Sequence, residues 1–166
     1  MNNLLSKTLI IGDLHLRNYT QYPGYLRSQI DAILSIFERE KFDNVVFLGD
    51  VFHNRKQTPT EMLAFRYILK ALKPHQTAFV IRGNHESETK ADDGITSLTL
   101  FQSDQVKVFE HVGMDGPYFH PDIKYYFIPH YEDESIIGKA LADAPKGSFV
   151  FGHFGYFGSV NSCSGS

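Results

Sequence analysis

The sequence is poor in cysteine, in net charge and in long apolar runs, and each absence excludes a class of protein. Cys163 is the single cysteine, so an intramolecular disulfide and a thiolate metal cluster are excluded and a reducing compartment is expected. The formal net charge of −3 gives no basic signal, so attraction for nucleic acid must come from a local patch or from bound metal. No segment approaches membrane-spanning length and no secretory signal opens the chain, which predicts a soluble, cytoplasmic protein with no membrane partner.

The 166 residues have the composition of an ordinary folded domain, with 42% hydrophobic and 21% charged residues. The chain is long enough for one core and too short for two comfortable ones, and it contains no linker, low-complexity tract or tandem repeat. Phenylalanine and tyrosine are plentiful, but most of them fall in strand or helix patterns. We therefore expect residues 1–166 to form one domain whose aromatic rings belong to the core rather than to base-stacking surfaces.

Four short apolar runs share one form. Each is rich in β-branched or aromatic residues and contains a glycine followed by Asp, Asn or His at its end. This composition, without polar alternation, predicts buried strands that are covered on both faces. The runs are Thr8–Asp13, Val45–Asp50, Ala78–Asn84 and Phe149–His153.

Helical periodicity separates the first three of these strands. Apolar residues recur at helical spacing over residues 26–37 and again over 62–72, where a preceding TPTE segment supplies the cap. The order βαβαβ implies parallel strands with right-handed crossovers. Farther along, ITSLTLF and DESIIGKALAD indicate helices, and VKVFE and IKYYFIPH indicate strands. The predicted fold class is therefore α/β.

The ends of the predicted strands carry polar side chains. In open α/β sheets, functional sites form beyond the carboxyl ends of the parallel strands. Carboxylate, amide and imidazole groups without sulfur suit Mn²⁺, Fe²⁺ or Zn²⁺ better than a structural thiolate zinc, and imidazole argues against calcium. The alternative is that these polar groups only bind water and backbone, but four such strand ends in order disfavour it. The candidate residues are Asp13, His15, Asp50, Asn84, His85 and His153.

Four motifs, DLH, GDVFHNR, RGNHE and GH, resemble in order the motifs of the calcineurin-like metallophosphoesterases. Within them, GDVFHNRKQTP resembles the nuclease subunit of SbcCD-type complexes and its Mre-type relatives, phage versions included. The resemblance runs from Thr8 to about Gly158. Protein serine/threonine phosphatases share RGNHES but have Asp-Arg-Gly where this chain has FHNR, which favours the nuclease branch.

This resemblance implies a metallophosphoesterase-type layered fold, with mixed β-sheets packed together and flanked by helices. It also implies two divalent metal ions, with Mn²⁺ as the first choice and Fe²⁺, Zn²⁺ or Mg²⁺ as alternatives. Asp13 and His15 would hold the first ion, Asn84 and His153 would hold the second, and Asp50 would bridge them. Such a pair of ions can activate a hydroxide for attack on a phosphodiester.

Two further histidines lie close to these motifs. By the resemblance, His85 would approach the substrate and protonate the leaving oxygen, and a supporting role without catalysis is the alternative. His53 would orient the phosphate, and a turn histidine bonded to backbone is an equally weighted interpretation. Arg17, Arg55 and Lys56 follow ligand motifs and are candidate contacts to DNA phosphates, although surface solubility also explains each of them.

The closing motif departs from the family pattern, which normally ends in Gly-His-x-His. Gly155 stands where the second histidine is expected. In one interpretation the motif is degraded and His130 is an extra ligand. In the other, which we favour, the segment around His153 is an earlier single-histidine motif, and the domain lacks C-terminal strands that lie beyond Ser166. A form without the closing motif is expected to be weakly active or inactive.

The leading hypothesis is a metal-dependent DNA phosphodiesterase, an exo- or endonuclease of the double-strand-break repair or recombination type. The resemblance alone implies its partners, which are DNA, a second copy in a homodimer and an SbcC-type ATPase subunit. The first alternative is a phosphomonoesterase, protein phosphatase or small phosphodiesterase of the same superfamily. The second alternative is a metal-poor domain that binds or assembles without catalysis.

Overall fold

The computed structural model describes residues 7–89, 96–115 and 123–155. The first half alternates strands and helices as the periodicity predicts. Its elements are β1 (Thr8–Ile11), α1 (Tyr25–Arg39), β2 (Asn44–Phe47), α2 (Pro59–Lys70) and β3 (Thr77–Ile81). The α2 helix begins with the predicted cap, in which Thr58 and Glu61 exchange side-chain and backbone hydrogen bonds.

The second half is less regular and supplies one strand that was not predicted. Its elements are η1 (Ser97–Phe101), β4 (Val106–Phe109), β5 (Gly113–Asp115), β6 (Tyr125–Ile128), α3 (Glu134–Asp143) and β7 (Phe149–Gly152). The short strand β5 escaped prediction because Gly, Met and Asp carry neither the β-branched nor the aromatic signal of a strand. Among the described residues, no helix has both the length and the apolar character that crossing a membrane requires.

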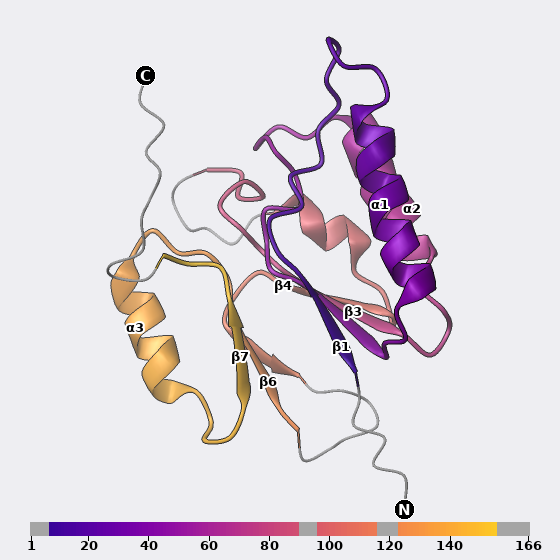
Figure 1. The fold of residues 1–166 in the computed structure, drawn as a ribbon. Coiled ribbons are helices and arrows are strands. Elements are labelled where there is room, and N and C mark those ends of the chain that lie inside the picture. Colours follow the sequence, from indigo (N-terminus) through magenta and orange to yellow (C-terminus); the bar gives the residue numbers. More distant parts are fainter. Residues whose placement is uncertain (1–6, 90–95, 116–122, 156–166) are drawn as a thin grey trace, which may run out of the picture.

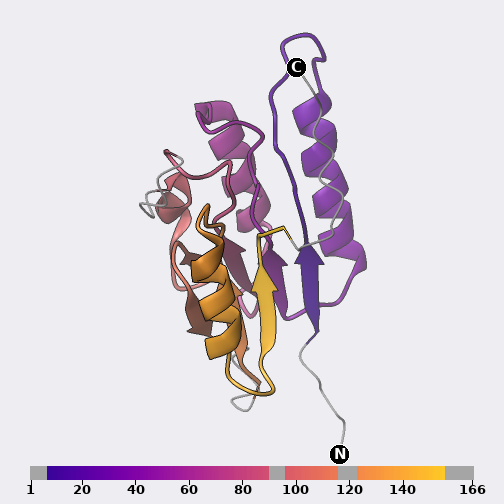
Figure 2. The ribbon, with the colours of Figure 1, turned by 90° about the vertical axis from the view of Figure 1, so that its left-hand side faces the viewer.

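Two sheets form the centre of the molecule (Figure 1). In the first, β1, β2, β3 and β4 lie side by side in that order and are all parallel. In the second, β5 is antiparallel to β6 and β7 is parallel to it. The helices α1 and α2 cover one face of the first sheet, and α3 lies on the outer side of the second sheet (Figure 2). The predicted α/β class, with packed sheets and flanking helices, is confirmed.

Three apolar clusters fill the spaces between these layers. The largest joins α1 and α2 to the first sheet through residues such as Phe37, Phe65 and Val45. The second lies between the sheets, where Phe79 and Phe127 stack with ring centroids 5.3 Å apart. The third packs α3 on the second sheet. The burial of apolar surface in these clusters fixes the strands relative to one another, and with them the loops that follow.

The expectation that every strand is covered on both faces holds for β2 and for nearly all of β3, and it is wrong for β1 and β7. Ile10 on β1 is 53% exposed, and Phe149 on β7 is 59% exposed. Within the described residues, β1 and β7 are edge strands of their sheets. The second sheet packs over β2, β3 and β4, and the cluster between the sheets includes no described residue of β1. Apolar composition therefore overestimated the burial of the edge strands.

Candidate metal centre

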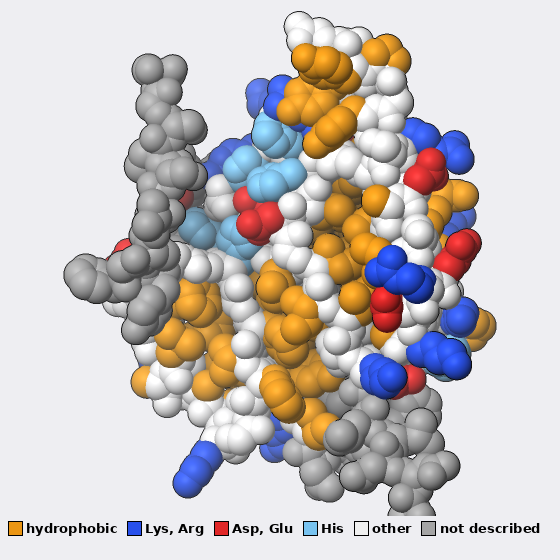
Figure 3. Space-filling view, in the orientation of Figure 1, with side chains coloured by type: hydrophobic (Ala, Val, Ile, Leu, Met, Phe, Trp, Pro, Cys, Tyr) orange, Lys and Arg blue, Asp and Glu red, His pale blue; other side chains and the backbone are white. Residues whose placement is uncertain are grey.

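The carboxyl ends of β1, β2, β3 and β7 meet at one margin of the two sheets. The backbone N–H of His15 donates to the carbonyl oxygen of Asp50 at 2.8 Å, so the segments after β1 and β2 continue side by side. The backbone N–H of His153 donates to the carbonyl oxygen of Ile128 at 3.1 Å, which fixes the end of β7 beside β6. Figure 3 shows histidine side chains gathered around acidic ones at this margin.

Two glycines allow the strand ends to approach this closely. Gly49 has a φ of 93°, and a Cβ atom there would lie 2.7 Å from Nδ1 of His153 and 2.9 Å from the backbone of Gly83. A Cβ atom on Gly83 would overlap the backbone nitrogen and the carboxylate of Asp50. Any side chain at either position would therefore separate the loops that carry the candidate ligands.

The backbone is strained at the ends of β1 and β2, where candidate ligands lie. Among the described residues, those other than glycine with positive φ are Asp13 at 31°, His15 at 45° and Asp50 at 45°. A side chain in this left-handed region costs on the order of 1–3 kcal/mol, and such residues cluster at functional sites. All three are metal ligands predicted from the sequence. The fold thus bears a local energetic cost to hold these side chains in place.

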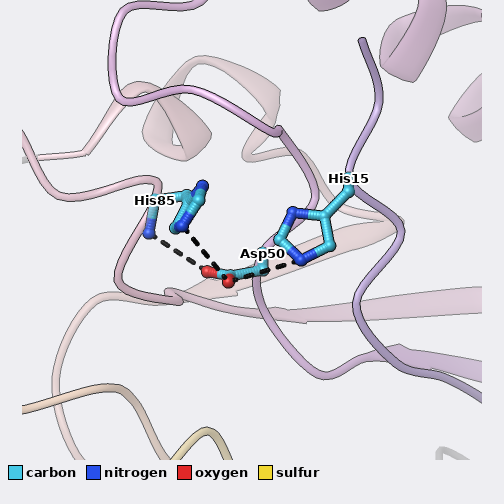
Figure 4. A group of neighbouring side chains, drawn as sticks. All are labelled: His15, Asp50 and His85. Carbon is cyan, nitrogen blue, oxygen red and sulfur yellow. Dashed lines mark hydrogen bonds and ion pairs between the residues drawn. The ribbon is translucent and has the colours of Figure 1, made fainter. Parts of the chain in front are cut away.

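Asp50 lies at the centre of the site. It is buried, and Figure 4 shows its carboxylate between the imidazoles of His15 and His85. One oxygen, Oδ2, lies 3.8 Å from Nε2 of His15 and 3.9 Å from Nε2 of His85. The other, Oδ1, lies 3.5 Å from Nε2 of His153. One oxygen therefore faces His15 and His85 and the other faces His153, as the predicted bridging role requires, and the role itself remains a prediction.

Two of these histidines have a fixed tautomer. Nδ1 of His85 hydrogen-bonds the carbonyl oxygen of His53, and Nδ1 of His153 lies 2.7 Å from the carbonyl oxygen of Leu48. A carbonyl oxygen can only accept, so each Nδ1 carries a hydrogen and Nε2 is the ring nitrogen that faces Asp50. Metal-binding histidines usually donate their second ring nitrogen in this way. Both rings are thus oriented as metal ligands are.

Asn84 lies against both Asp50 and His153. One atom of its amide lies 3.1 Å from Nε2 of His153 and 3.2 Å from each carboxylate oxygen of Asp50. All three neighbours are acceptors, so the amide nitrogen belongs on this side and donates to them. Half a turn of the amide puts its oxygen at the same point. Asn84 can therefore serve either as a donor that holds the acceptors together or as the predicted metal ligand.

Sequence reasoning missed Glu86, which ties the ligand loops together. Its Oε2 accepts from the backbone N–H groups of Asp50 and Gly83, and its Oε1 accepts from that of Phe52, each at 2.9 Å. Complete burial raises the pKa of the Glu86 carboxyl to about 8; the charge of Asp50 acts in the same direction, and the three N–H donors oppose both. In the sequence this residue is one acid among many, and only its place in the RGNHE motif points to it.

His53 and Arg17 form a pair at the mouth of the site. Nη1 of Arg17 lies 2.6 Å from Nε2 of His53, which accepts because a guanidinium can only donate. The His53 ring stands edge-on to His15 and His85, with ring centroids 5.6 and 6.0 Å away. Partial burial and the charge of Arg17 lower the pKa of His53, and both neighbouring histidines act in the same direction. His53 is therefore neutral at pH 7 and positions Arg17.

Asp13 and His130 lie at the border of the site. Oδ1 of Asp13 is 3.9 Å from Nδ1 of His153, and the Asp13 side chain is largely exposed. His130 stands edge-on to His153 with ring centroids 6.0 Å apart, and its Nε2 lies 3.7 Å from Oε1 of Glu132. Their roles as ligands remain predictions.

Arg55 and Lys56 occupy different surroundings from Arg17. Nη1 of Arg55 donates to the carbonyl oxygens of Ser87 and Thr89, both at 3.2 Å, and so holds the segment that follows β3. Lys56 is exposed. Of the three basic residues predicted to contact phosphate, Arg17 lies beside the histidines, whereas the guanidinium of Arg55 is hydrogen-bonded to backbone carbonyl oxygens.

The donor set suits a divalent ion. Ligand atoms of His15, Asp50 and His85 all lie within 4.8 Å of one another, and Asn84 and His153 also lie within 3.5 Å of the same carboxylate. Nδ1 of His15 is buried and, within the described part of the chain, has no hydrogen-bond partner, which is an uncommon state for a polar atom. Imidazole, carboxylate and amide ligands without sulfur are typical of Mn²⁺, Fe²⁺ and Zn²⁺ sites. These residues therefore fit the predicted metal.

Almost the whole chain matches one known protein family. A family model described as calcineurin-like phosphoesterase matches residues 6–162. No curated protein matches the sequence. Among solved structures, the crystal structure of the Pseudomonas putida nuclease MPE is similar, with 17% sequence identity and a TM-score of 0.44. The similarity covers 74% of this chain and 54% of that one, so the chain spans about half the length of the nuclease.

Proposed function

The chain belongs to the calcineurin-like phosphoesterase family, and from this premise we propose that it is a metal-dependent phosphodiesterase that hydrolyses DNA. The observation that carries the proposal is the buried carboxylate of Asp50, which has His15 and His85 beside one oxygen and His153 beside the other. A carboxylate placed in this way suits two divalent ions that share it. The side chains of His15 and His85 are partly exposed, so a phosphate can reach them.

The proposed ligands follow from the motif resemblance. Asp13 and His15 would hold one ion, Asn84 and His153 would hold the other, and Asp50 would contact both. Mn²⁺ is the expected metal. When bound, divalent ions supply Lewis-acid activation of a phosphate and of water, whose pKa falls from about 16 to about 7.

His85 is the proposed proton donor to the leaving oxygen. Its Nδ1 hydrogen is held by the carbonyl oxygen of His53, so Nε2 is the atom that can take up and release a second proton. Nε2 lies 3.9 Å from Oδ2 of Asp50, and the ring is partly exposed, so a substrate can approach it. The same position also suits a metal ligand, and this is the alternative role for His85.

Arg17 is the proposed contact to the phosphate that enters the site. It pairs with a neutral imidazole, His53, rather than with a carboxylate, and so keeps its charge for an anion. An arginine fork is well suited to phosphate oxygens. DNA as the substrate, a homodimer, an ATPase partner and a role in repair or recombination rest on the motif resemblance, and they are parts of the proposal that need separate tests.

Hydrolysis of a labelled DNA oligonucleotide in Mn²⁺ tests the proposed function. We expect cleavage that EDTA stops and that Asp50→Ala reduces to background, because the shared carboxylate is lost. Asp31→Ala removes an exposed carboxylate on α1 and is the matched control that should keep activity. Hydrolysis of p-nitrophenyl phosphate without cleavage of DNA would instead identify a phosphomonoesterase. No hydrolysis of either substrate would favour a binding or assembly domain.

A further inference from the structure

Three tyrosines pack together where the chain enters α1. The ring of Tyr19 stands edge-on to the rings of Tyr22 and Tyr25, with centroids 5.9 and 5.1 Å away. Backbone hydrogen bonds run from the Tyr22 N–H to the Tyr19 carbonyl oxygen and from the Tyr25 N–H to the Tyr22 carbonyl oxygen. These turns bring every third side chain to the same side. We refer to Tyr19, Tyr22 and Tyr25 as the tyrosine cluster.

Tyr19 is half-buried, but the other two members of the tyrosine cluster are exposed, contrary to the expectation that the aromatic rings belong to the core. Tyr22 is 65% exposed and Tyr25 is 44% exposed. Figure 3 shows hydrophobic side chains at the tip above α1, next to the histidines of the metal centre. Burial in the fold does not account for rings that remain in water, and grouped apolar surface of this kind indicates a binding site.

The tyrosine cluster has a fixed position relative to the metal centre. The backbone N–H of Asn18 donates to Oε1 of Glu61 at 3.0 Å, which fastens the loop to α2. The backbone N–H of Arg17 donates to Oε1 of Gln29 at 3.2 Å, and Nε2 of Gln29 donates to the carbonyl oxygen of His15, also at 3.2 Å. The segment before the cluster is thus hydrogen-bonded to α1 through Gln29, to α2 through Glu61, and, again through Gln29, to the candidate ligand His15. Binding of a ligand to the rings therefore costs little conformational entropy in this segment.

Arg17 connects the cluster to the metal centre. Its Cζ lies 4.0 Å from the centroid of the Tyr19 ring, and its Nη1 donates to the Tyr19 hydroxyl at 3.0 Å. The same Nη1 donates to His53, whose ring is edge-on to His15. Contacts therefore run without a break from a candidate ligand through Arg17 to the tyrosines. A nucleotide whose phosphate lies against Arg17 would have its base beside these rings.

We propose that the tyrosine cluster is a base-stacking site for unpaired nucleotides of the strand that enters the metal centre. Aromatic side chains stack on bases of any sequence, because every base has a π face. In an intact duplex these faces are covered by neighbouring base pairs, so only single-stranded or frayed nucleotides can lie on the rings. The site thus favours unpaired DNA over duplex. This inference rests on the proposed function, in that it takes the bound strand to be the DNA substrate.

Fluorescence anisotropy with a labelled oligothymidine of ~10 nucleotides tests the site by affinity alone, in EDTA, where hydrolysis does not interfere. We expect Tyr22→Ala to weaken binding of this single strand by about 10-fold, since one stacked base is lost. Tyr22→Phe keeps the ring and should bind as the wild type does. Tyr67→Ala is the matched control, because Tyr67 is 59% exposed on α2, outside the cluster, and its loss should leave the affinity unchanged.

A blunt duplex of the same length is the second probe, and its affinity should be unaffected by Tyr22→Ala. The base-stacking site is overturned if wild type fails to bind the single strand, if Tyr22→Ala and Tyr67→Ala bind it equally, or if strand and duplex lose affinity equally. These outcomes are independent of turnover. If Tyr22→Ala loses affinity for the single strand only and the protein does not hydrolyse DNA, the proposed enzyme is rejected and the base-stacking site is supported. If the protein hydrolyses DNA and Tyr22→Ala keeps its affinity for the single strand, the proposed enzyme is supported and the base-stacking site is rejected.

Discussion

At the scale of single residues, the candidate ligands adopt conformations that their side chains disfavour. His15 and Asp50 both have a φ of 45°, and the hydrogen bond from the His15 N–H to the Asp50 carbonyl oxygen joins them. Such strain persists only where the surrounding structure over-determines the backbone. Here the flanking strands and the close approach of the loops supply that constraint. Stability is therefore given up at the residues that the metal would need.

A pair of substitutions at His15 measures this strain. At a left-handed position His15→Gly should be more stable than His15→Ala by about 1 kcal/mol, because glycine lacks the Cβ atom that disfavours positive φ. The free energy of unfolding is measured in urea with EDTA present. Ser35, exposed in α1, is the control position, where alanine should be the more stable of the two. Equal stability of the two His15 variants would show that the backbone is unstrained there.

At the scale of elements, Glu86 joins the loops that follow β2 and β3. Its carboxyl group accepts hydrogen bonds from the N–H groups of Asp50, Phe52 and Gly83, which would otherwise be buried without acceptors. An unpaired buried N–H costs more than an average hydrogen bond contributes. The two loops are therefore cross-linked by one side chain, and the position of Asp50 depends on it.

Glu86→Gln tests this cross-link with almost no change of volume. The amide nitrogen cannot accept, so at least one backbone N–H loses its partner, and we expect the free energy of unfolding to fall by about 1–3 kcal/mol. Denaturation in urea measures the loss. Glu40→Gln changes an exposed carboxylate that contacts Arg39 and should alter stability by less than about 0.5 kcal/mol. An effect at Glu86 no larger than at Glu40 would contradict the role.

The sequence predicted the helices and strands better than it predicted what surrounds them. Strands with β-branched and aromatic runs, and helices with apolar spacing, were predictable because local propensity and burial agree in them. The exposure of Ile10 and Phe149 could not be predicted from the sequence, because the whole topology decides which strand lies at an edge of a sheet. Glu86 escaped for a related reason, because Asp50 and Phe52 lie 36 and 34 positions away from it in the sequence and no spacing rule connects them. The tyrosine cluster escaped because the spacing of aromatic residues does not tell whether their rings are buried or exposed.

At the scale of the whole molecule, the candidate metal centre is built from both sheets. His15, Asp50, Asn84 and His85 follow strands of the first sheet, whereas His153 follows β7 of the second. Ligands from separate layers can meet only when the layers are packed correctly. Metal binding should therefore stabilise the complete fold and not one loop.

Thermal unfolding in increasing Mn²⁺ tests this coupling. The midpoint of the wild type should rise with concentration, and the stabilisation reaches about 2.7 kcal/mol at a hundredfold excess over the dissociation constant. Asp50→Ala should abolish the rise, because both proposed ions lose the shared carboxylate. His85→Ala should keep it if His85 is the proton donor. An equal loss in both variants would make His85 a ligand, and no rise in the wild type would contradict the metal centre.

The hydrogen bond from Nδ1 of His153 to the carbonyl oxygen of Leu48 joins residues 105 positions apart. Closing so long a loop costs chain entropy, and β7 must reach the first sheet before the bond can form. We therefore expect an assembly order in which His15, Asp50 and His85 come together with the first sheet and His153 arrives last. One half of the centre could then form while the other half is still open, and the final step of folding would also be the step that completes the chemistry.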